Sequence, residues 1–422
     1  MKNPRKIQNR NYMTAAAILL VTVILIITGS IFKFGIQKPG SDSGLAAQSV
    51  PETLSAEEIK NQTVAQAERL AAGYDYDGAC AKIKEIENYS ADAELTKKIT
   101  EYEALKAKTV RWEDMTKVTH IFFHSLIYDT DKAFKSDSAS GYNMVMTTVD
   151  EFNKILQSMY DKGFVLVSIH DLVKEVPGAN GEVTYEAGDI MLPPGKIPFV
   201  LSQDDVCYYE YMEDTGFATK LVVGEDGKVT CEYKNDDGTL SYGAYDMVPI
   251  VDAFIEQHPD FSYRGAKGIL ALTGYNGVLG YRTDPEVYKD SPTLQADIDE
   301  AKKVAEALKA DGWEFASHSW GHIHMMQTSW EKFKTDTDKW EQYVETDVII
   351  YPFGEDVGDW QPYTADNQKY SYLRDAGFRY FCNVDGSQYW VQIGSDYVRQ
   401  GRRNIDGQRM WQQMQTGKDW LG

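Results

Sequence analysis

Residues 197–206 read IPFVLSQDDV, an apolar run that ends in two adjacent carboxylic acids, Asp204 and Asp205. Three other apolar runs also end in polar groups: VTHIFF at 118–123 precedes His124, WEFAS at 313–317 precedes His318, and DVIIY at 347–351 precedes the loop PFGED. Such short runs alternate with amphipathic segments, which predicts strand and helix units. In a (β/α) barrel, catalytic groups lie at the carboxyl ends of several strands. We therefore predict an α/β fold over residues 111–422, a distorted (β/α) barrel of about seven strands, with these polar groups on one rim.

The hydrophobic pattern also predicts the individual elements. Phe152, Ile155, Leu156 and Met159 have helical spacing, and their helix should end near Gly163. Strands are predicted at 118–123, 164–169, 198–201, 268–272, 313–316, 348–351 and 379–382, and further helices at 247–257, 294–310 and 365–376. After Val206, EDG and DDG turn signals between strand-like runs predict hairpins beside the site.

The amino-terminal segment predicts membrane attachment. Residues 14–32, TAAAILLVTVILIITGSIF, are apolar over a length that can cross a bilayer. Basic residues precede this run, so the positive-inside tendency predicts a cytoplasmic tail and a transmembrane helix over residues 1–34, with the rest of the chain extracytoplasmic. The chain would then be a single-pass protein of the bacterial cell membrane. The alternative is a cleaved signal peptide with a peptidase site near Ala46 and Ala47. Residues 35–52 predict a flexible linker, and residues 53–110 predict a helical spacer.

Composition argues against nucleic acid as a partner and leaves one possible disulfide open. The net charge of −21 argues against nucleic acid as a partner, because nucleic acid binding rewards clustered Lys and Arg. The four cysteines are widely scattered with no CxxC pair, so neither a zinc ribbon nor a dense disulfide framework is indicated. A single bridge between Cys207 and Cys231 stays open.

The segment SHSWGH holds two histidines, His318 and His322, four residues apart. Two imidazoles at this spacing can bind one metal ion, and a carboxylate from elsewhere completes a three-ligand site with an open position. Asp204 and Asp205 follow an apolar strand, where unpaired charge is costly. One of the two can bind the metal while the other faces the activated water. Structural histidines and a helix-capping acid pair are the alternatives.

The order of these motifs, Asp-Asp, then HSxxH, then a strand ending in PxG, resembles polysaccharide deacetylases of the NodB-homology type (carbohydrate esterase family 4-like). Two further stretches, EFNKILQSMYDKGFVLVSIHDLV at 151–173 and IFFHS at 121–125, resemble the branch that acts on poly-N-acetylglucosamine. The resemblance covers roughly residues 115–410, and its motifs are short. It implies metal-dependent hydrolysis of N-acetyl groups on a cell-wall or extracellular polysaccharide.

The resemblance also implies a role for individual residues. Asp204 would be the general base, and Asp205, His318 and His322 the ligands of a divalent metal, zinc first, with cobalt, nickel or manganese as alternatives. His124 would protonate the leaving amine. The substrate or the oxyanion would meet Tyr351, Pro352, Gly354 and Trp320, with a backbone N–H near Tyr351 as the oxyanion donor. Arg403 is the candidate for orienting the base, from a tail that also contains Arg399 and Arg402.

The sequence departs from the family pattern at four places. Gln203 and Val206 replace the Phe and Gly of the usual TFDDG motif, Ile350 stands where many members carry an arginine, and the terminal LxH motif is missing. Because a β-branched residue resists positive φ, we expect the loop at Val206 to follow a different backbone path. A catalytically inactive glycan-binding module of the same fold, an O-acetyl esterase, and a serine hydrolase using Ser202 or Ser317 are the competing interpretations.

Overall fold

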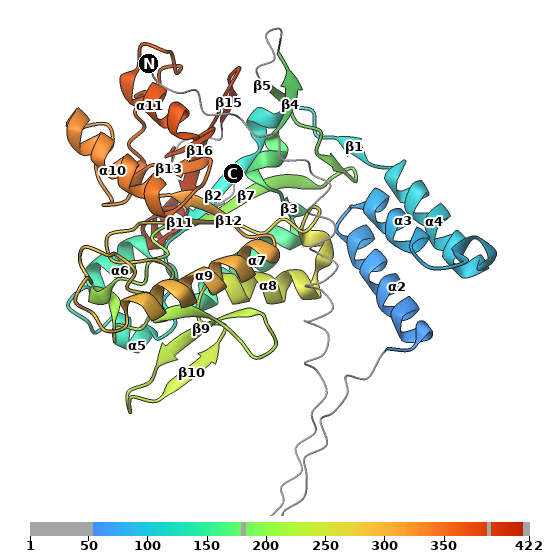
Figure 1. Cartoon of the computed structure of the whole chain (residues 1–422), viewed down its shortest axis with the longest axis horizontal. Coiled ribbons are helices and arrows are strands. Elements are labelled where there is room, and N and C mark those ends of the chain that lie inside the picture. The colour runs from blue at the N-terminus through green and yellow to red at the C-terminus, as the bar shows by residue number, and fades with distance from the viewer. Residues whose placement is uncertain (1–53, 179–182, 386–389, 417–422) are drawn as a thin grey trace, which may run out of the picture.

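The computed structural model describes residues 54–178, 183–385 and 390–416, and its centre is a closed parallel barrel (Figure 1). Seven strands form the ring in the order β11-β12-β13-β14-β16-β2-β7, and β11 pairs back onto β7. Their bounds are β2 Thr119–Phe123, β7 Ile197–Gln203, β11 Ile269–Leu272, β12 Glu314–Ser317, β13 Val348–Ile350, β14 Tyr380–Val384 and β16 Val398–Asn404. The predicted α/β barrel of about seven strands is confirmed.

One ring strand differs from the prediction. The stretch 164–169 was predicted as a strand, but β3 Phe164–Leu166 is short and pairs only with the first half of β7. The ring is instead completed by β16, which pairs in parallel with β14 and β2. Its sequence, VRQGRRN, does not alternate between apolar and polar residues, so the hydrophobic pattern did not predict this strand. Several of its polar side chains are nevertheless buried against partners from other strands.

Helices surround the barrel and cover its apolar outer face. The principal ones are α7 Val149–Asp161, α8 Met247–Gln257, α9 Leu294–Ala310, α10 Trp330–Tyr343 and α11 Gln368–Ala376. In α7, Thr148 and Glu151 form a reciprocal capping box, and Phe152, Ile155, Leu156 and Met159 are buried as their spacing predicts. The helices predicted at 247–257 and 294–310 have the predicted bounds.

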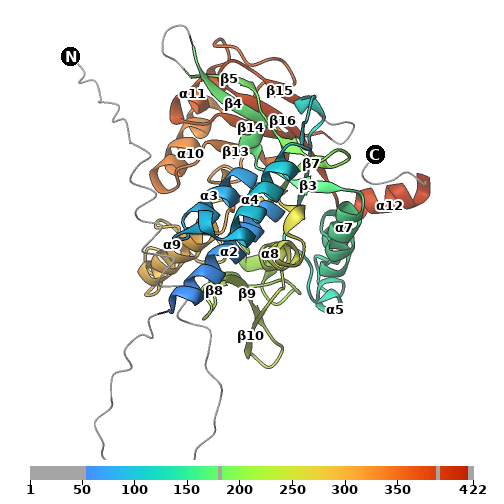
Figure 2. The same cartoon turned by 90° about the vertical axis from the view of Figure 1, so that its right-hand side faces the viewer.

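The amino-terminal helices pack against one flank of the barrel (Figure 2). They are α2 Ala56–Ala72, α3 Tyr76–Lys84 and α4 Ala93–Lys106, with a short turn η3 Tyr89–Ala91. The Tyr74 hydroxyl donates to the Asp260 carbonyl at 2.7 Å, and the Arg264 N–H donates to the Gly73 carbonyl at 2.7 Å. In the part of the chain that the structure describes, no helix is both long enough and apolar enough to cross a bilayer, and the predicted span at 14–32 lies outside it.

The remaining elements are short insertions and hairpins. The hairpins predicted after Val206 form an antiparallel sheet of β8 Lys220–Val223, β9 Val229–Lys234 and β10 Leu240–Gly243, which packs on α8 and α9. The other elements are β1 Val110–Arg111, β4 Val173–Pro177, β5 Val183–Ala187, β6 Met191–Leu192, β15 Val391–Ile393, α5 Thr130–Ala133, α6 Ala139–Val145, α12 Gly407–Thr416, η4 Met115–Lys117, η5 Ile169–Leu172, η6 Glu210–Met212, η7 Pro259–Phe261 and η8 Pro352–Gly354. The four cysteines are buried and free, so the open Cys207–Cys231 pairing does not form.

Candidate metal centre

The loop that follows β7 carries Asp204 and Asp205 and contains one residue with a left-handed backbone. Asp205 has a φ of 59°, so the left-handed position lies on the aspartate rather than on Val206. Val206 is fully buried and its N–H donates to the Ala271 carbonyl. The Gln203 side chain donates to Asp246 at 2.8 Å, which gives this buried amide a partner. Val206 thus avoids the positive φ that a β-branched residue resists.

The loop that follows β12 carries His318 and His322. Asp336, on α10, holds this loop by accepting hydrogen bonds from the N–H groups of Trp320 and Gly321 at 2.9 and 2.7 Å. His322 has a φ of 48°, a position that non-glycine residues seldom adopt. Such backbone strain concentrates at functional sites, where the surrounding fold maintains it.

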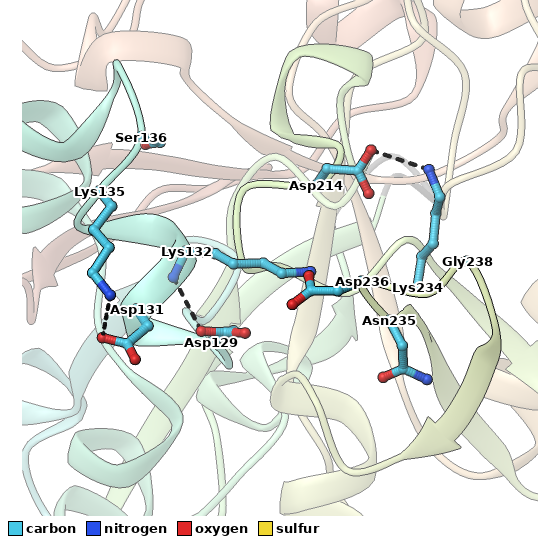
Figure 3. A pocket seen from close by; sticks show the side chains of 10 residues that line it. All are labelled: Asp129, Asp131, Lys132, Lys135, Ser136, Asp214, Lys234, Asn235, Asp236 and Gly238. Carbon is cyan, nitrogen blue, oxygen red and sulfur yellow. Dashed lines mark hydrogen bonds and ion pairs between the residues drawn. The ribbon is translucent and has the colours of Figure 1, made fainter.

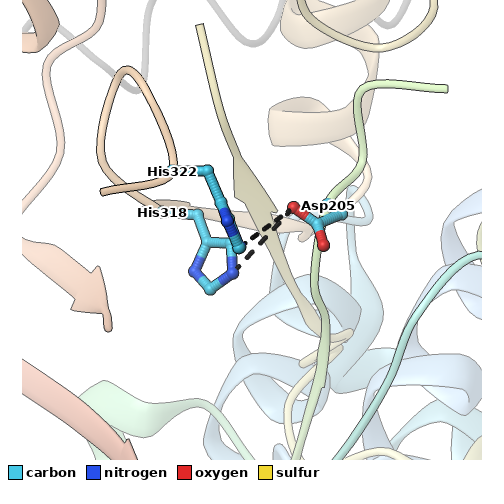
Figure 4. Close-up of side chains that lie close together, drawn as sticks. All are labelled: Asp205, His318 and His322. Carbon is cyan, nitrogen blue, oxygen red and sulfur yellow. Dashed lines mark ion pairs between the residues drawn. The ribbon is translucent and has the colours of Figure 1, made fainter. Parts of the chain in front are cut away.

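Asp205, His318 and His322 converge on one point, as Figure 4 shows. Asp205 Oδ1 lies 4.0 Å from His318 Nε2 and 3.7 Å from His322 Nε2. One ligand atom from each residue lies within 4.8 Å of the others. Zinc with ligands at 2.0–2.1 Å in a tetrahedral shell separates them by about 3.3 Å, so a small closure of these side chains would bring all three onto one ion.

The protonation of His318 supports a cation at this point. Its Nδ1 lies 2.7 Å from the Ile350 carbonyl oxygen, which can only accept, so Nδ1 carries the hydrogen. In the neutral ring Nε2 is then an acceptor, and it faces the carboxylate oxygen of Asp205, which is another acceptor. In that tautomer two acceptors face each other, an arrangement that a cation between them would stabilise. Burial lowers the pKa of His322, and the attraction of Asp205 only partly offsets this effect, so the His322 ring favours its neutral form. The donor set therefore fits a divalent metal.

Asp204 lies beside this centre and is held by a buried arginine. Arg402 Nη1 and Nη2 donate to its two carboxylate oxygens at 2.7 and 2.9 Å, and Asp204 Oδ2 is 4.0 Å from His318 Nε2. Burial alone would raise the pKa of Asp204, but the charge and hydrogen bonds of Arg402, together with the neighbouring His318 and His124, outweigh it and hold the pKa well below its usual range. Arg402, not the predicted Arg403, is thus the residue that orients Asp204. Gln400, two residues earlier on β16, also lies in the barrel interior, where it contacts His120. Because alternate residues of a strand face the same side, this spacing could have selected Arg402 instead of Arg403 from the sequence.

His124 reaches the centre as predicted. Its Nε2 lies 4.0 Å from Asp205 Oδ2, on the oxygen that does not face the two other imidazoles, and its side chain is 25% exposed. The role of proton donor stays a prediction. The position is compatible with that role because the ring is both accessible and next to the proposed ligand.

The loop after β13 differs from the prediction at Tyr351. Its N–H donates to the Cys382 carbonyl at 2.9 Å, so it is not free to bind an oxyanion. Its side chain is fully buried, and its hydroxyl pairs with Tyr363. In η8, Pro352 and Gly354 flank Phe353, whose ring is 55% exposed and lies 4.5 Å, centroid to centroid, from His322. Sequence reasoning missed this aromatic residue.

Trp320 was predicted to face substrate, but its ring is buried. It is 7% exposed, packs on Tyr343 at 5.2 Å, and lies under the Lys339 ammonium at 4.5 Å from the ring centroid. A Cβ at Gly274 would come within 2.3 Å of this ring, so the indole fills the space next to that glycine. A sugar therefore cannot stack on it.

Three tyrosines beside Asp205 were not predicted. Tyr209 donates to Asp205 Oδ1 at 2.6 Å, and its ring stacks between those of Tyr211 and Tyr275 at 5.3 and 5.4 Å. Tyr211 is 63% exposed, so the stack extends from the carboxylate to the surface. YYEY at 208–211 begins three residues after Asp205, and this proximity in sequence was the only available signal.

The serine hydrolase interpretation lacks an accessible nucleophile. Ser202 is fully buried inside the barrel, where its hydroxyl meets His120 at 2.9 Å and Arg402 at 3.1 Å. Ser317 is 2% exposed and accepts the Ser319 N–H. Neither hydroxyl can reach a substrate without opening the barrel.

A surface hollow elsewhere has different chemistry (Figure 3). It lies between α5 and the β9–β10 hairpin and is lined mainly by charged side chains. These pair with each other: Lys132 with Asp236 at 2.6 Å, and Lys234 with Asp214 at 3.0 Å. Because the charges are satisfied internally, the hollow indicates no ligand.

No family model matches the sequence, and no curated protein matches it. Among solved structures, the chain is similar to a Streptococcus pyogenes deacetylase, PplD, in complex with acetate, at 16% sequence identity and a TM-score of 0.36. The match covers 71% of this chain and 98% of that chain. At this TM-score we base the function on the geometry of the site.

Proposed function

We propose that this protein is a metal-dependent polysaccharide deacetylase that hydrolyses N-acetyl groups. The observation that carries the proposal is the meeting of Asp205, His318 and His322 around one point, with Asp204 held next to them by Arg402. Two imidazoles and one carboxylate are a common ligand set of catalytic zinc sites, in which a fourth position stays open. A free carboxylate beside that position is the arrangement that hydrolysis by activated water requires.

Each side chain of the site has a separate task. A divalent cation held by Asp205, His318 and His322 would supply Lewis acidity toward an acyl oxygen and a water molecule. Asp204 Oδ2 takes the proton of the attacking water, and the two Arg402 hydrogen bonds fix the orientation of that carboxylate. His124 Nε2, on the other side of Asp205, gives a proton to the leaving nitrogen. The Ile350 carbonyl keeps His318 in the tautomer that presents Nε2.

The exposed aromatic rings support a glycan as the substrate. Phe353 and Tyr211 come from the loops after β13 and β7, and both are more than half exposed. Aromatic faces at a polar site suit the apolar faces of pyranose rings. We propose zinc as the metal, an acetylated extracytoplasmic polysaccharide as the substrate, and tethering to the membrane through residues 1–34. An O-acetyl ester is the alternative substrate at the same site.

Acetate release from acetylated glycans by the full-length chain tests this function. We expect activity that a chelator abolishes and that added Zn²⁺ or Co²⁺ restores. Asp204→Asn should lose acetate release while still binding metal, whereas His318→Ala should lose both. Activity that is indifferent to chelators would reject the metal mechanism. Metal binding with no acetate release from N- or O-acetylated glycans would instead support the glycan-binding interpretation.

A further inference from the structure

One hydroxyl outside the proposed catalytic set contacts a proposed metal ligand. Tyr209 donates to Asp205 Oδ1 at 2.6 Å, and its oxygen lies 3.0 Å from Thr273 Oγ1. Tyr209 is 4% exposed and Thr273 is fully buried. A carboxylate oxygen only accepts, so the phenol donates to Asp205 and the Thr273 hydroxyl can donate to the phenol. The result is a buried chain of hydroxyl groups that ends on the ligand.

The hydrogen bond selects one of the two carboxylate oxygens. Oδ1 faces both His318 and His322, whereas Oδ2 faces His124. A half turn of the carboxylate about its Cβ–Cγ bond only exchanges two equivalent oxygens, but any partial rotation would break the short bond from Tyr209. The phenol therefore keeps the metal-facing oxygen turned toward the imidazole pair.

Tyr209 is itself held by contacts with the loop after β11. Arg282 donates to the Tyr208 carbonyl at 2.8 Å and to the Asn276 carbonyl at 3.1 Å, which joins the two backbone segments. The Tyr275 ring stacks on Tyr209 with an interplanar angle of 28°. These contacts fix the position of the phenol independently of Asp205, so the phenol can act as a support for the ligand.

We propose, resting on the proposed function, that Tyr209 is a positioning residue that sets the metal affinity of the centre through Asp205 Oδ1. A ligand that a hydrogen bond already orients loses less rotational freedom when a cation binds. Partners of this kind commonly change metal affinity about 10- to 100-fold when they are removed. The role belongs to this chain's own YYEY segment, which begins three residues after Asp205.

The test compares two tyrosines of the same stack in the full-length chain. Tyr209→Phe keeps the ring and removes the hydroxyl, and Tyr211→Phe is the matched control, because no hydrogen bond among the described residues joins Tyr211 to Asp205. After removal of metal, competition with a chromophoric chelator measures Zn²⁺ affinity. We expect Tyr209→Phe to bind Zn²⁺ about 10- to 100-fold more weakly, and Tyr211→Phe to match wild type. The visible absorption of bound Co²⁺ should shift in Tyr209→Phe alone.

Thr273→Val supplies a second variant that leaves Tyr209 in place. It should weaken Zn²⁺ binding in the same direction and by less than Tyr209→Phe does, at an unchanged unfolding midpoint of the metal-free chain. Equal affinity in wild type and Tyr209→Phe would overturn the proposal, as would equal losses in both phenylalanine variants. If Tyr209→Phe does not fold, unweakened binding in Thr273→Val would overturn it. A wild-type chain that binds no Zn²⁺ defeats both proposals, whereas one that binds Zn²⁺ but releases no acetate defeats only the proposed function.

Discussion

Two clusters of imidazole and carboxylate groups lie at opposite ends of the barrel and differ in spacing. The rim cluster, Asp205, His318 and His322, lies at the carboxyl ends of the strands, with 3.7 and 4.0 Å between Asp205 Oδ1 and the two Nε2 atoms. The amino-end cluster joins His170 to Glu314 at the start of β12 and to Asp347 just before β13, at 2.7 and 3.1 Å.

The difference in spacing separates a binding site from a structural contact. In the amino-end cluster both ring nitrogens of His170 meet a carboxylate at hydrogen-bond distance, so the group is satisfied by the protein alone. In the rim cluster the two imidazoles and Asp205 face each other beyond hydrogen-bond distance, at a spacing that could hold a metal ion. The same residue types thus stabilise the fold at one end and, we propose, bind a metal at the other.

The largest expected effect is the loss of metal-dependent stability in His318→Ala. Zinc at about 1,000 times its Kd should stabilise the wild-type chain by about 4 kcal/mol. The variant should show no such gain, because the rim cluster retains only two ligands. Thermal unfolding with and without zinc measures the difference. A full zinc-dependent gain in the variant would contradict the assignment of His318 as a ligand.

Arg402→Ala tests the buried ion pair between Arg402 and Asp204, next to the rim cluster. Asp204 is 3% exposed, so removal of Arg402 leaves a buried and unpaired charge, which should cost about 3–5 kcal/mol of unfolding free energy. Denaturant unfolding of the metal-free chain measures this cost. The control is Arg374→Ala, whose partners Asp375 and Asp396 lie at the surface, and it should change stability by less than about 0.5 kcal/mol. Equal effects in the two variants would contradict the importance of burial.

His170→Ala should separate the two clusters. It removes both hydrogen bonds of the amino-end cluster and leaves Glu314 and Asp347 without their shared cation. Because the His170 side chain is 40% exposed, we expect a loss of only about 1 kcal/mol. Zinc affinity and acetate release should equal those of wild type. A change in zinc affinity would show that the two ends of the barrel are coupled.

The smallest expected effect is the pH dependence of that contribution. Burial by itself would lower the pKa of His170, but hydrogen bonds to Asp347 and Glu314 outweigh it and raise the pKa to about 10. A raised pKa stabilises the fold fully below the unfolded value of about 6.5, and this stabilisation disappears as the pH rises through about 10. The stability difference between wild type and His170→Ala, measured in denaturant, should therefore shrink between pH 6.5 and 10. A constant difference would show that His170 acts by packing rather than by charge.

The barrel and the three residues of the rim cluster could be predicted from the sequence because they depend on local patterns. Apolar runs predicted six of the seven ring strands, and an acid pair and two histidines at strand ends predicted the convergence of Asp205, His318 and His322. Strand β16 was missed because its buried side chains are arginine and glutamine, whose burial depends on partners from other strands. For the same reason the sequence predicted that Arg403 orients Asp204, whereas in the structure Arg402 does so.

Other residues of the site were decided by contacts across the fold. The sequence by itself determined which side chains end each strand, since strand and helix periodicity is a property of neighbouring residues. Only the tertiary structure decided that the Tyr351 N–H is used by Cys382, that Trp320 is buried against Gly274, and that Tyr209 reaches Asp205. Hydrogen bonds and burial join residues that are distant in sequence, so the distances between donors and acceptors exist only in the folded chain. These distances are what distinguish the rim cluster from the amino-end cluster.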